Sequence, residues 1–196
     1  AIFLGFTFAL QLYNHYFSAL LAVIIGLSGF LFIQRKQLAP YLIAGVIASL
    51  LYLPHIPISL NHFSIGGVGE WLGKPNNTWI IDHILYIFNN SIILFTISLF
   101  IVGFLRYFDR NKCVLNKKQI LLITWFLMPL MIGFFYSKYV NPVLQNSVLV
   151  FSMPFLLIFI FSFLPKKISH LSSLILVFTI SAFSIQSFII DGFKHK

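Results

Sequence analysis

The sequence predicts an all-α, polytopic membrane protein with about six full transmembrane helices, a truncated leading helix and a short interfacial helix. Three observations support this fold class. Hydrophobic residues make up 59% of the 196 residues and charged residues only 9%, whereas a soluble domain carries about 25% charged residues. Uncharged apolar runs of about the length of a bilayer crossing recur along the chain. Cations gather between these runs and not within them.

The net charge of +9 could also indicate a nucleic-acid partner. The cations instead follow the positive-inside pattern of membrane proteins, in which short cytoplasmic loops are basic. On the predicted inner side lie Arg35, Lys36, Arg106, Arg110, Lys112, Lys117, Lys118, Lys166 and Lys167. On the predicted outer side lie Lys74, Lys138, Lys194 and Lys196. We therefore predict membrane lipids, and no nucleic acid, as partners of the basic clusters.

The direction of the chain follows from its first long apolar run. A polar and aromatic cluster at residues 13–16 precedes the uncharged run 17–33, and two cations, Arg35 and Lys36, follow it. Roughly 17 residues at about 1.5 Å each are long enough to cross a bilayer core. Aromatic rings favour the headgroup level and cations favour the cytoplasm. The run therefore predicts a span with its cluster outside and its cations inside.

Before this span, residues 2–12 are too short to cross a bilayer. The chain opens without Met or a cationic leader, so we expect a truncated helix with further residues upstream. After it, residues 41–53 are expected to return outward, with Pro40 in the first turn. Small residues one turn apart, at 44 and 48 and at 45 and 49, favour close helix packing, although small residues are also common in any span.

Next, residues 59–78 hold four glycines and Pro75, which predicts an irregular outer loop. Residues 79–86 predict a short amphipathic helix lying at the interface. An outer loop is expected at residues 137–147. The remaining predicted spans are 92–104, 120–135 with a kink at Pro129, 148–164 broken by Pro154, and 171–190.

Ionisable groups are nearly absent from the predicted spans, which argues against a proton-coupled pump or a cation channel. Polar groups gather on the outer side, where a site would suit a reaction on a lipid-borne headgroup. No His-x-x-x-His, Cys-x-x-Cys or glycine-rich phosphate loop occurs, so we predict no metal site and no cofactor. The candidate substrate-binding residues are His15, Tyr16, Glu70, Trp71, Lys138 and Gln145.

The first two pairs of candidates each allow two interpretations. His15 and Tyr16 could position a phosphate or a sugar hydroxyl, or they could belong to an interfacial aromatic belt. Glu70 beside Trp71 could be an acid next to a sugar-stacking ring, or both could lie in a solvated loop. An indole face suits the apolar face of a pyranose, so the functional interpretation of this pair is a carbohydrate site.

Two further pairs also allow two interpretations. Lys138 and Gln145 could hold a lipid phosphate, with the lysine acting as a point charge. Alternatively, Lys138 is an interfacial lysine that extends its ammonium group toward water. Asp82 and His83 could form an acid–base pair, but adjacent residues on a helix do not face each other. The predicted site therefore does not include this last pair.

Three segments together resemble a known family. The sequence Tyr-Asn-His-Tyr-Phe at residues 13–17, followed by a span and a basic turn, resembles the "HYF" helix of polytopic glycosyltransferases with the GT-C fold. These proteins are related to glycosyltransferase family 39 and the protein mannosyltransferases. Residues 52–57 are similar to the end of the next helix in that family, and residues 141–154 are similar to its late outer loop and following span.

The resemblance implies an inverting transferase in the bacterial cytoplasmic membrane. Such an enzyme passes a sugar from a polyprenyl-phosphate carrier to a lipid, glycan or protein acceptor on the outer face. Its catalytic Asp or Glu lies in the first outer loop, which would fall upstream of Ala1. Residues 1–196 would then be the C-terminal transmembrane portion, with no catalytic residue of its own.

The chain departs from the family at one point. Many relatives carry an Arg-Tyr pair shortly after the proline that matches Pro142, where this chain has Ser147 and Val148. If that arginine holds the carrier phosphate, Lys138 or Gln145 must replace it, or the donor differs. The sequence also allows two other functions: a flippase or transporter of lipid-linked sugars, and a non-catalytic membrane subunit.

Overall fold

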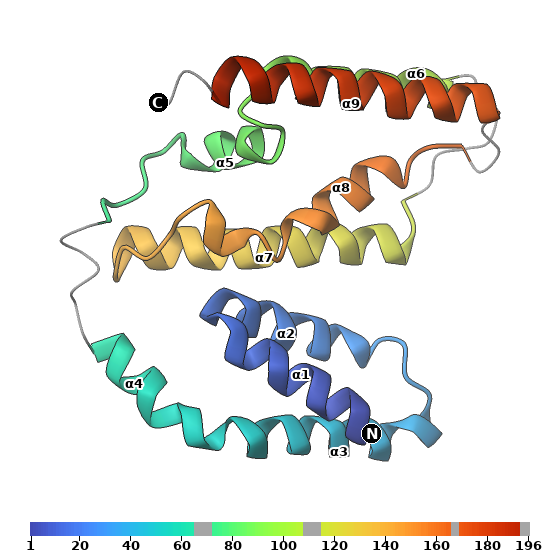
Figure 1. Cartoon of the computed structure of the whole chain (residues 1–196). Coiled ribbons are helices and arrows are strands. Elements are labelled where there is room, and N and C mark those ends of the chain that lie inside the picture. The colour runs from blue at the N-terminus through green and yellow to red at the C-terminus, as the bar shows by residue number, and fades with distance from the viewer. Residues whose placement is uncertain (65–71, 108–114, 166–168, 193–196) are drawn as a thin grey trace. The chain divides into compact units, whose positions relative to one another are not determined.

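The computed structural model describes residues 1–64, 72–107, 115–165 and 169–192. Every regular element in these ranges is a helix, which confirms the all-α prediction (Figure 1). The chain forms two compact units. The first unit is Ala1–Pro75 with Thr124–Ser152, and the second is Asn76–Ile123 with Met153–Lys196.

In the first unit, three helices follow one another closely along the chain. They are α1 (Ile2–Asn14), α2 (Tyr16–Gly29) and α3 (Arg35–Tyr52). A 3-10 turn, η1 (Leu53–His55), leads into α4 (Ile56–Ser64). The later part of α7 (Lys117–Tyr139) and the 3-10 turn η3 (Ser147–Leu149) complete the unit. In α7 the indole N–H of Trp125 donates to Ser28 Oγ of α2 at 3.0 Å.

Small residues let α1 and α3 pack closely. Of the four small positions that the sequence predicts for such packing, those at 44 and 48 take part. Ala44 and Ala48 are buried on α3. A Cβ added to Gly5 of α1 would lie 2.8 Å from the Ile47 side chain and 2.9 Å from the Ala44 carbonyl oxygen. A Cβ added to Gly45 would meet nothing within 4 Å, so that face of α3 does not take part in the packing.

Helix α3 ends at Tyr52, close to the predicted end of the span that begins at residue 41, but no loop follows it. The chain stays helical through η1 into α4, so Arg35–His62 is a stretch of 28 residues. Pro54 and Pro57 lie in first turns, where a missing N–H breaks no helical hydrogen bond. Residues 59–64, predicted as loop, are consequently helical. Pro40 also lies inside α3 and not in its first turn, because the helix already begins at Arg35.

In the second unit, helices are present where the sequence predicts them, as α5 (Trp79–Ile87) and α6 (Ile92–Tyr107). The two helices meet at a bend of 69°. Two consecutive asparagines with positive φ, Asn89 and Asn90, form this bend, and asparagine tolerates the left-handed conformation better than most residues. The Asn89 amide donates to Ser184 Oγ at 3.1 Å. That serine lies on α9 (His170–Gly192), which packs against α6.

The predicted span 148–164 is not a single helix in the structure. Its place is taken by η3, a turn at residues 150–152 and the nine-residue helix α8 (Met153–Phe161). Nine residues extend only about 14 Å, which does not cross a bilayer core. Pro154 lies in the first turn of α8, so it helps start a helix and does not interrupt one. Pro129, by contrast, lies within α7, which is helical over all of its 23 residues.

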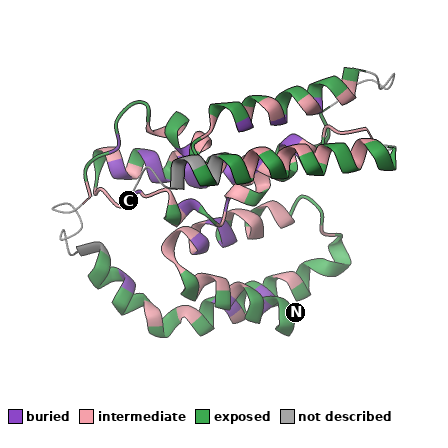
Figure 2. Cartoon of the chain, turned by 45° about the horizontal axis from the view of Figure 1, so that its top comes forward, coloured by how far each residue is buried: buried purple, intermediate pink, exposed green. Residues whose placement is uncertain are grey.

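Among the described residues, two helical stretches are long and apolar enough to cross a membrane, Arg35–His62 and Lys117–Tyr139. The count becomes three if the bent pair of α5 and α6 forms one span. Much of the helical surface is exposed (Figure 2), and many of the exposed residues are large and apolar. Phe3 is 84% exposed and Phe178 is 76% exposed, for example. Large exposed apolar surfaces of this kind are rare on soluble monomers and fit contact with lipid.

Candidate functional site

A cavity of about 740 Å³ lies within the first unit, and we call it the His15 cavity. Its volume falls within the range of small-molecule sites, about 300–1,000 Å³. The start of α2, the end of α7 and the segment after α7 contribute most of its wall. Its lining residues are His15, Tyr16, Phe17, Leu20, His62, Leu72, Ile132, Gly133, Tyr136, Asn141, Val143, Gln145 and Val148.

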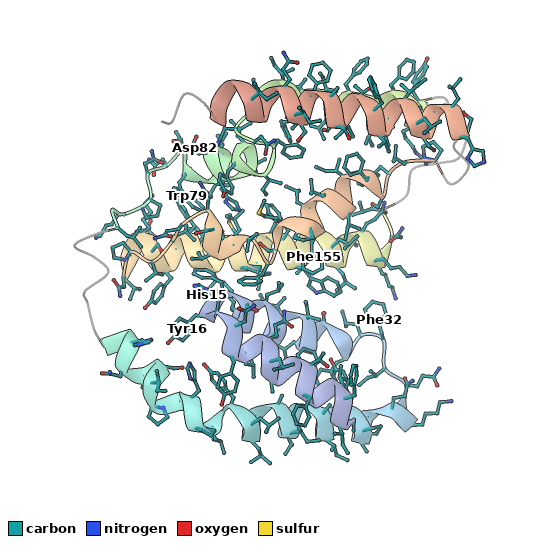
Figure 3. The ribbon with its side chains drawn as sticks, viewed as in Figure 1. His15, Tyr16, Phe32, Trp79, Asp82 and Phe155 are labelled. Carbon is teal, nitrogen blue, oxygen red and sulfur yellow. The ribbon has the colours of Figure 1, made fainter. Side chains whose placement is uncertain are left out.

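Three of the six predicted site residues come together at this cavity. His15 and Tyr16 lie where α1 passes into α2 (Figure 3). Gln145 follows α7 and reaches the same cavity although it is far away in the sequence. The outer polar cluster predicted from the sequence is therefore partly a real spatial cluster.

Of the other three predicted residues, the structure describes only Lys138. Lys138 does not line the cavity, and its ammonium nitrogen lies 5.4 Å from the ring centre of Phe134 and 5.8 Å from that of Tyr139. These distances fit cation–π contacts. Glu70 and Trp71 lie outside the described residues.

His15 interrupts the helical backbone and caps the helix that follows. Its backbone is extended, with φ −162° and ψ 151°, and its Nδ1 accepts a hydrogen bond from the Phe17 N–H at 3.2 Å. Because Nδ1 is an acceptor, the ring proton of the neutral form sits on Nε2. The imidazole stacks on Phe17 and Phe151 with centroids 6.0 and 6.2 Å away. Burial lowers the pKa of His15 below its ordinary value of 6.5.

Tyr16 connects the start of α2 with α4. Its hydroxyl lies 2.7 Å from Nδ1 of His62, and the two rings meet edge to face. Both side chains line the His15 cavity. The pair therefore places a phenol and an imidazole, each able to donate and accept hydrogen bonds, in one part of the wall.

Another part of the wall depends on a glycine of α7. A Cβ added to Gly133 would lie 2.5 Å from Cε1 of Phe17 and 3.0 Å from Cδ1 of Leu144. Glycine thus allows Phe17 to lie directly against α7. The chain after α7 is held by Ser137, whose buried Oγ accepts from the Val143 N–H at 3.1 Å. Ser147 Oγ donates to Oε1 of Gln145 at 3.3 Å and orients that amide.

Three polar lining residues, His62, Tyr136 and Asn141, were not predicted as site residues. His62 was expected in an irregular loop, and only the helical continuation of α3 into α4 brings it to Tyr16. Tyr136 was expected just beyond the end of a span. Asn141 belongs to the segment that resembles the family's late outer loop, which was the available signal for it.

The Asp82–His83 pair in α5 makes contacts other than an acid–base pair. Asp82 Oδ2 accepts a hydrogen bond from Thr78 Oγ1 at 2.9 Å, at the beginning of the helix. The buried imidazole of His83 stacks on Trp79 at 5.1 Å and on Tyr86 at 6.3 Å. The absence of this pair from the predicted site agrees with these contacts.

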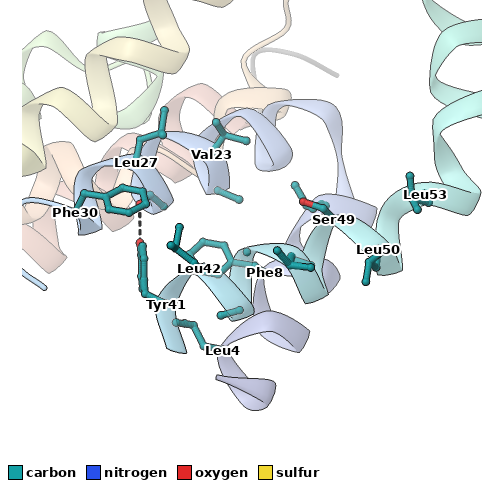
Figure 4. A pocket seen from close by; sticks show the side chains of 17 residues that line it. Leu4, Phe8, Val23, Leu27, Phe30, Tyr41, Leu42, Ser49, Leu50 and Leu53 are labelled. Carbon is teal, nitrogen blue, oxygen red and sulfur yellow. Dashed lines mark hydrogen bonds between the residues drawn. The ribbon is translucent and has the colours of Figure 1, made fainter. Parts of the chain in front are cut away.

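A second cavity in the first unit, of about 570 Å³, is almost entirely apolar. It lies among α1, α2 and α3 and is lined by residues such as Phe8, Leu27 and Leu50 (Figure 4). Its polar side chains are Tyr41 and Ser49, and the Tyr41 hydroxyl donates to the Gly26 carbonyl. This cavity offers room for an apolar group but little chemistry.

Searches against protein-family models, curated proteins and solved structures find no match to this chain. The candidate site accordingly rests on the sequence and the geometry of the first unit.

The capping role of His15 leads to a pH-dependent stability. Because burial lowers its pKa in the folded state, the unfolded state takes up a proton more readily below pH 6.5. The free energy of unfolding is therefore expected to fall as the pH drops from 6.5 through the folded pKa. Asparagine is a good N-cap and does not titrate. His15→Asn should therefore reduce the decrease in unfolding free energy at low pH. The decrease is measured by thermal unfolding in detergent between about pH 7.5 and 5.

The matched control is His170→Asn. His170 is exposed at the start of α9 and does not line the His15 cavity. This variant should keep the acid-induced loss of the parent protein. An identical pH dependence in His15→Asn and the parent would show that protonation of His15 is not coupled to unfolding.

Proposed function

We propose that this chain is the C-terminal portion of a multi-pass membrane glycosyltransferase. It would take a sugar from a polyprenyl-phosphate carrier and pass it to a lipid, glycan or protein acceptor. The reaction would occur on the outer face of the bacterial cytoplasmic membrane. The acceptor hydroxyl attacks the anomeric carbon, the bond from that carbon to the phosphate oxygen breaks, and polyprenyl phosphate leaves. A carboxylate upstream of Ala1 would accept the hydroxyl proton.

The observation that carries this proposal is the composition of the His15 cavity. Aromatic side chains and two amides, Asn141 and Gln145, line the same space. Amides donate and accept hydrogen bonds at once, as sugar hydroxyls require. Aromatic rings offer flat apolar faces to the apolar face of a pyranose. A largely apolar pocket with a few convergent polar groups is the usual form of a small-molecule site.

The proposed membrane setting has about six spans. It is supported by the two long apolar helices, the bent pair of α5 and α6, and the shorter apolar helices α2 and α9. The basic clusters between the predicted spans support an outer position for His15. A cavity on that side would be open to a carrier whose headgroup faces away from the cytoplasm.

Tyr16→Phe in the full-length protein tests the site. The substitution removes the hydroxyl that pairs with His62 but keeps the ring. Loss of one or two hydrogen bonds in the bound complex should lower the transfer rate about tenfold. The rate is measured with purified protein in proteoliposomes and a radiolabelled polyprenyl-phosphate hexose. Tyr139→Phe is the control, because Tyr139 is 69% exposed and does not line the cavity.

The same assay separates the proposal from its rivals. Hexose transfer with a normal rate in Tyr16→Phe would remove the His15 cavity from the mechanism. Movement of the labelled headgroup across the bilayer, with the sugar–phosphate bond intact, would identify a flippase instead. If the full-length protein shows neither hexose transfer nor headgroup movement, the result favours a non-catalytic membrane subunit.

A further inference from the structure

We infer that the His15 cavity receives the uncharged saccharide of its ligand and that the phosphate group lies outside it. This inference rests on the proposed function, because it says which part of a lipid-phosphate sugar enters the cavity. It predicts selectivity for neutral sugar headgroups over phosphate headgroups.

The first argument is the kind of polar group in the described lining. These groups are two imidazoles, two phenols and two amides, and none of the described lining residues is a lysine or an arginine. Lysine and arginine are the side chains that most strongly offset the cost of taking a phosphate out of water. The cavity is therefore chemically suited to hydroxyl groups.

The second argument concerns His15, which could otherwise supply a positive charge. Its Nδ1 accepts the Phe17 N–H, so a proton on that atom would break the cap of α2. Burial also lowers the pKa of this imidazole, which keeps it neutral at pH 7. Neutral His15 presents an N–H at Nε2, which donates to an oxygen without carrying a charge.

The third argument is the pairing of donors with acceptors. The Gln145 Oε1 accepts a hydrogen bond from Ser147 Oγ at 3.3 Å. Tyr16 and His62 share one hydrogen bond of 2.7 Å. The amides and imidazoles provide both donors and acceptors for vicinal hydroxyls, whereas an ionised phosphate group only accepts. The mixed set of groups matches a sugar better than a phosphate.

Two small amphiphiles with the same tail test this selectivity. Octyl glucoside carries a neutral hexose, and octyl phosphate carries an anion. Binding of each to the full chain in lipid nanodiscs is measured by equilibrium dialysis, with empty nanodiscs subtracted. We expect saturable binding of octyl glucoside, at least roughly tenfold tighter than that of octyl phosphate. Gln145→Ala should weaken octyl glucoside binding about fivefold through the lost hydrogen bonds.

The control for Gln145→Ala is Gln186→Ala, because Gln186 is exposed on α9 and does not line the cavity. It should bind octyl glucoside like the parent. Circular dichroism and gel filtration confirm that each variant is folded, and Asn141→Ala provides a second cavity variant if Gln145→Ala fails this check.

Two results would overturn the inference. One is octyl phosphate binding as tightly as octyl glucoside, and the other is unchanged octyl glucoside binding in the folded cavity variants. Its failure is distinguishable from that of the proposed function. Selective octyl glucoside binding without any hexose transfer by the full-length protein would retain the saccharide site and remove the transferase. Hexose transfer together with tight octyl phosphate binding would retain the transferase and remove the selective saccharide site.

Discussion

Phe126→Ala is expected to lower the free energy of unfolding by about 2 kcal/mol or more. Phe126 is 1% exposed on α7, next to the equally buried Leu130 one turn later. Removing the ring leaves a cavity of roughly 100 Å³, and cavities cost about 24 cal/mol per Å³. In a bilayer this packing term dominates, because lipid tails are as apolar as the protein core. The change is measured as the unfolding free energy in SDS titrations.

Phe135→Ala is the matched control on the same helix. Phe135 is 53% exposed, so truncating its ring leaves little or no internal cavity. Its unfolding free energy should stay within about 0.5 kcal/mol of the parent value. Equal losses in the two variants would mean that the face of α7 that carries Phe126 is not a packed core.

Gly5→Ala is expected to lower the unfolding free energy by about 1–3 kcal/mol through overpacking. The added methyl group would lie 2.8 Å from the Ile47 side chain and 2.9 Å from the carbonyl oxygen of Ala44. A backbone atom of α3 cannot rotate away, so α1 and α3 must separate to make room. The change in stability is measured as a shift in the midpoint of thermal unfolding in detergent. Unfolding is monitored through the loss of monodisperse protein.

Gly45→Ala tests the same chemistry without the contact. A Cβ at this position meets nothing within 4 Å, and alanine favours a helix over glycine by about 1 kcal/mol. This variant should be as stable as the parent protein or more stable. If Gly45→Ala lowered the free energy of unfolding as much as Gly5→Ala, the cause would be a general effect of alanine on the helix. It would not be the contact between α1 and α3.

Proline placement explains where the predicted helices and the observed ones differ. In the sequence, the prolines at positions 54, 57 and 154 predict helix breaks, since proline lacks an N–H and obstructs the preceding turn. Each of these prolines in fact lies in a first turn, where neither property matters. Sequence alone shows that a proline is present, but the helix start that accommodates it depends on what the flanking residues pack against.

The candidate site shows the same division. His15, Tyr16 and Gln145 were found because polar groups between long apolar runs are conspicuous in the sequence. His62 was missed because its partner is 46 residues away and its own segment was predicted to be a loop. Lys138 was chosen for its charge, yet it contacts the rings of Phe134 and Tyr139 and not the cavity. Charge can be read from a sequence, whereas side-chain direction cannot.

By itself, the sequence determined that the chain is helical and carries an excess of apolar surface, because these properties follow from composition and periodicity. It also determined the approximate places of α5, α6 and α9, none of which contains a proline. Only the tertiary structure decided which polar residues share a cavity and which small residues form a contact. The physical reason is that packing couples residues far apart in the chain, and a local pattern contains no information about which distant residue will pack against it.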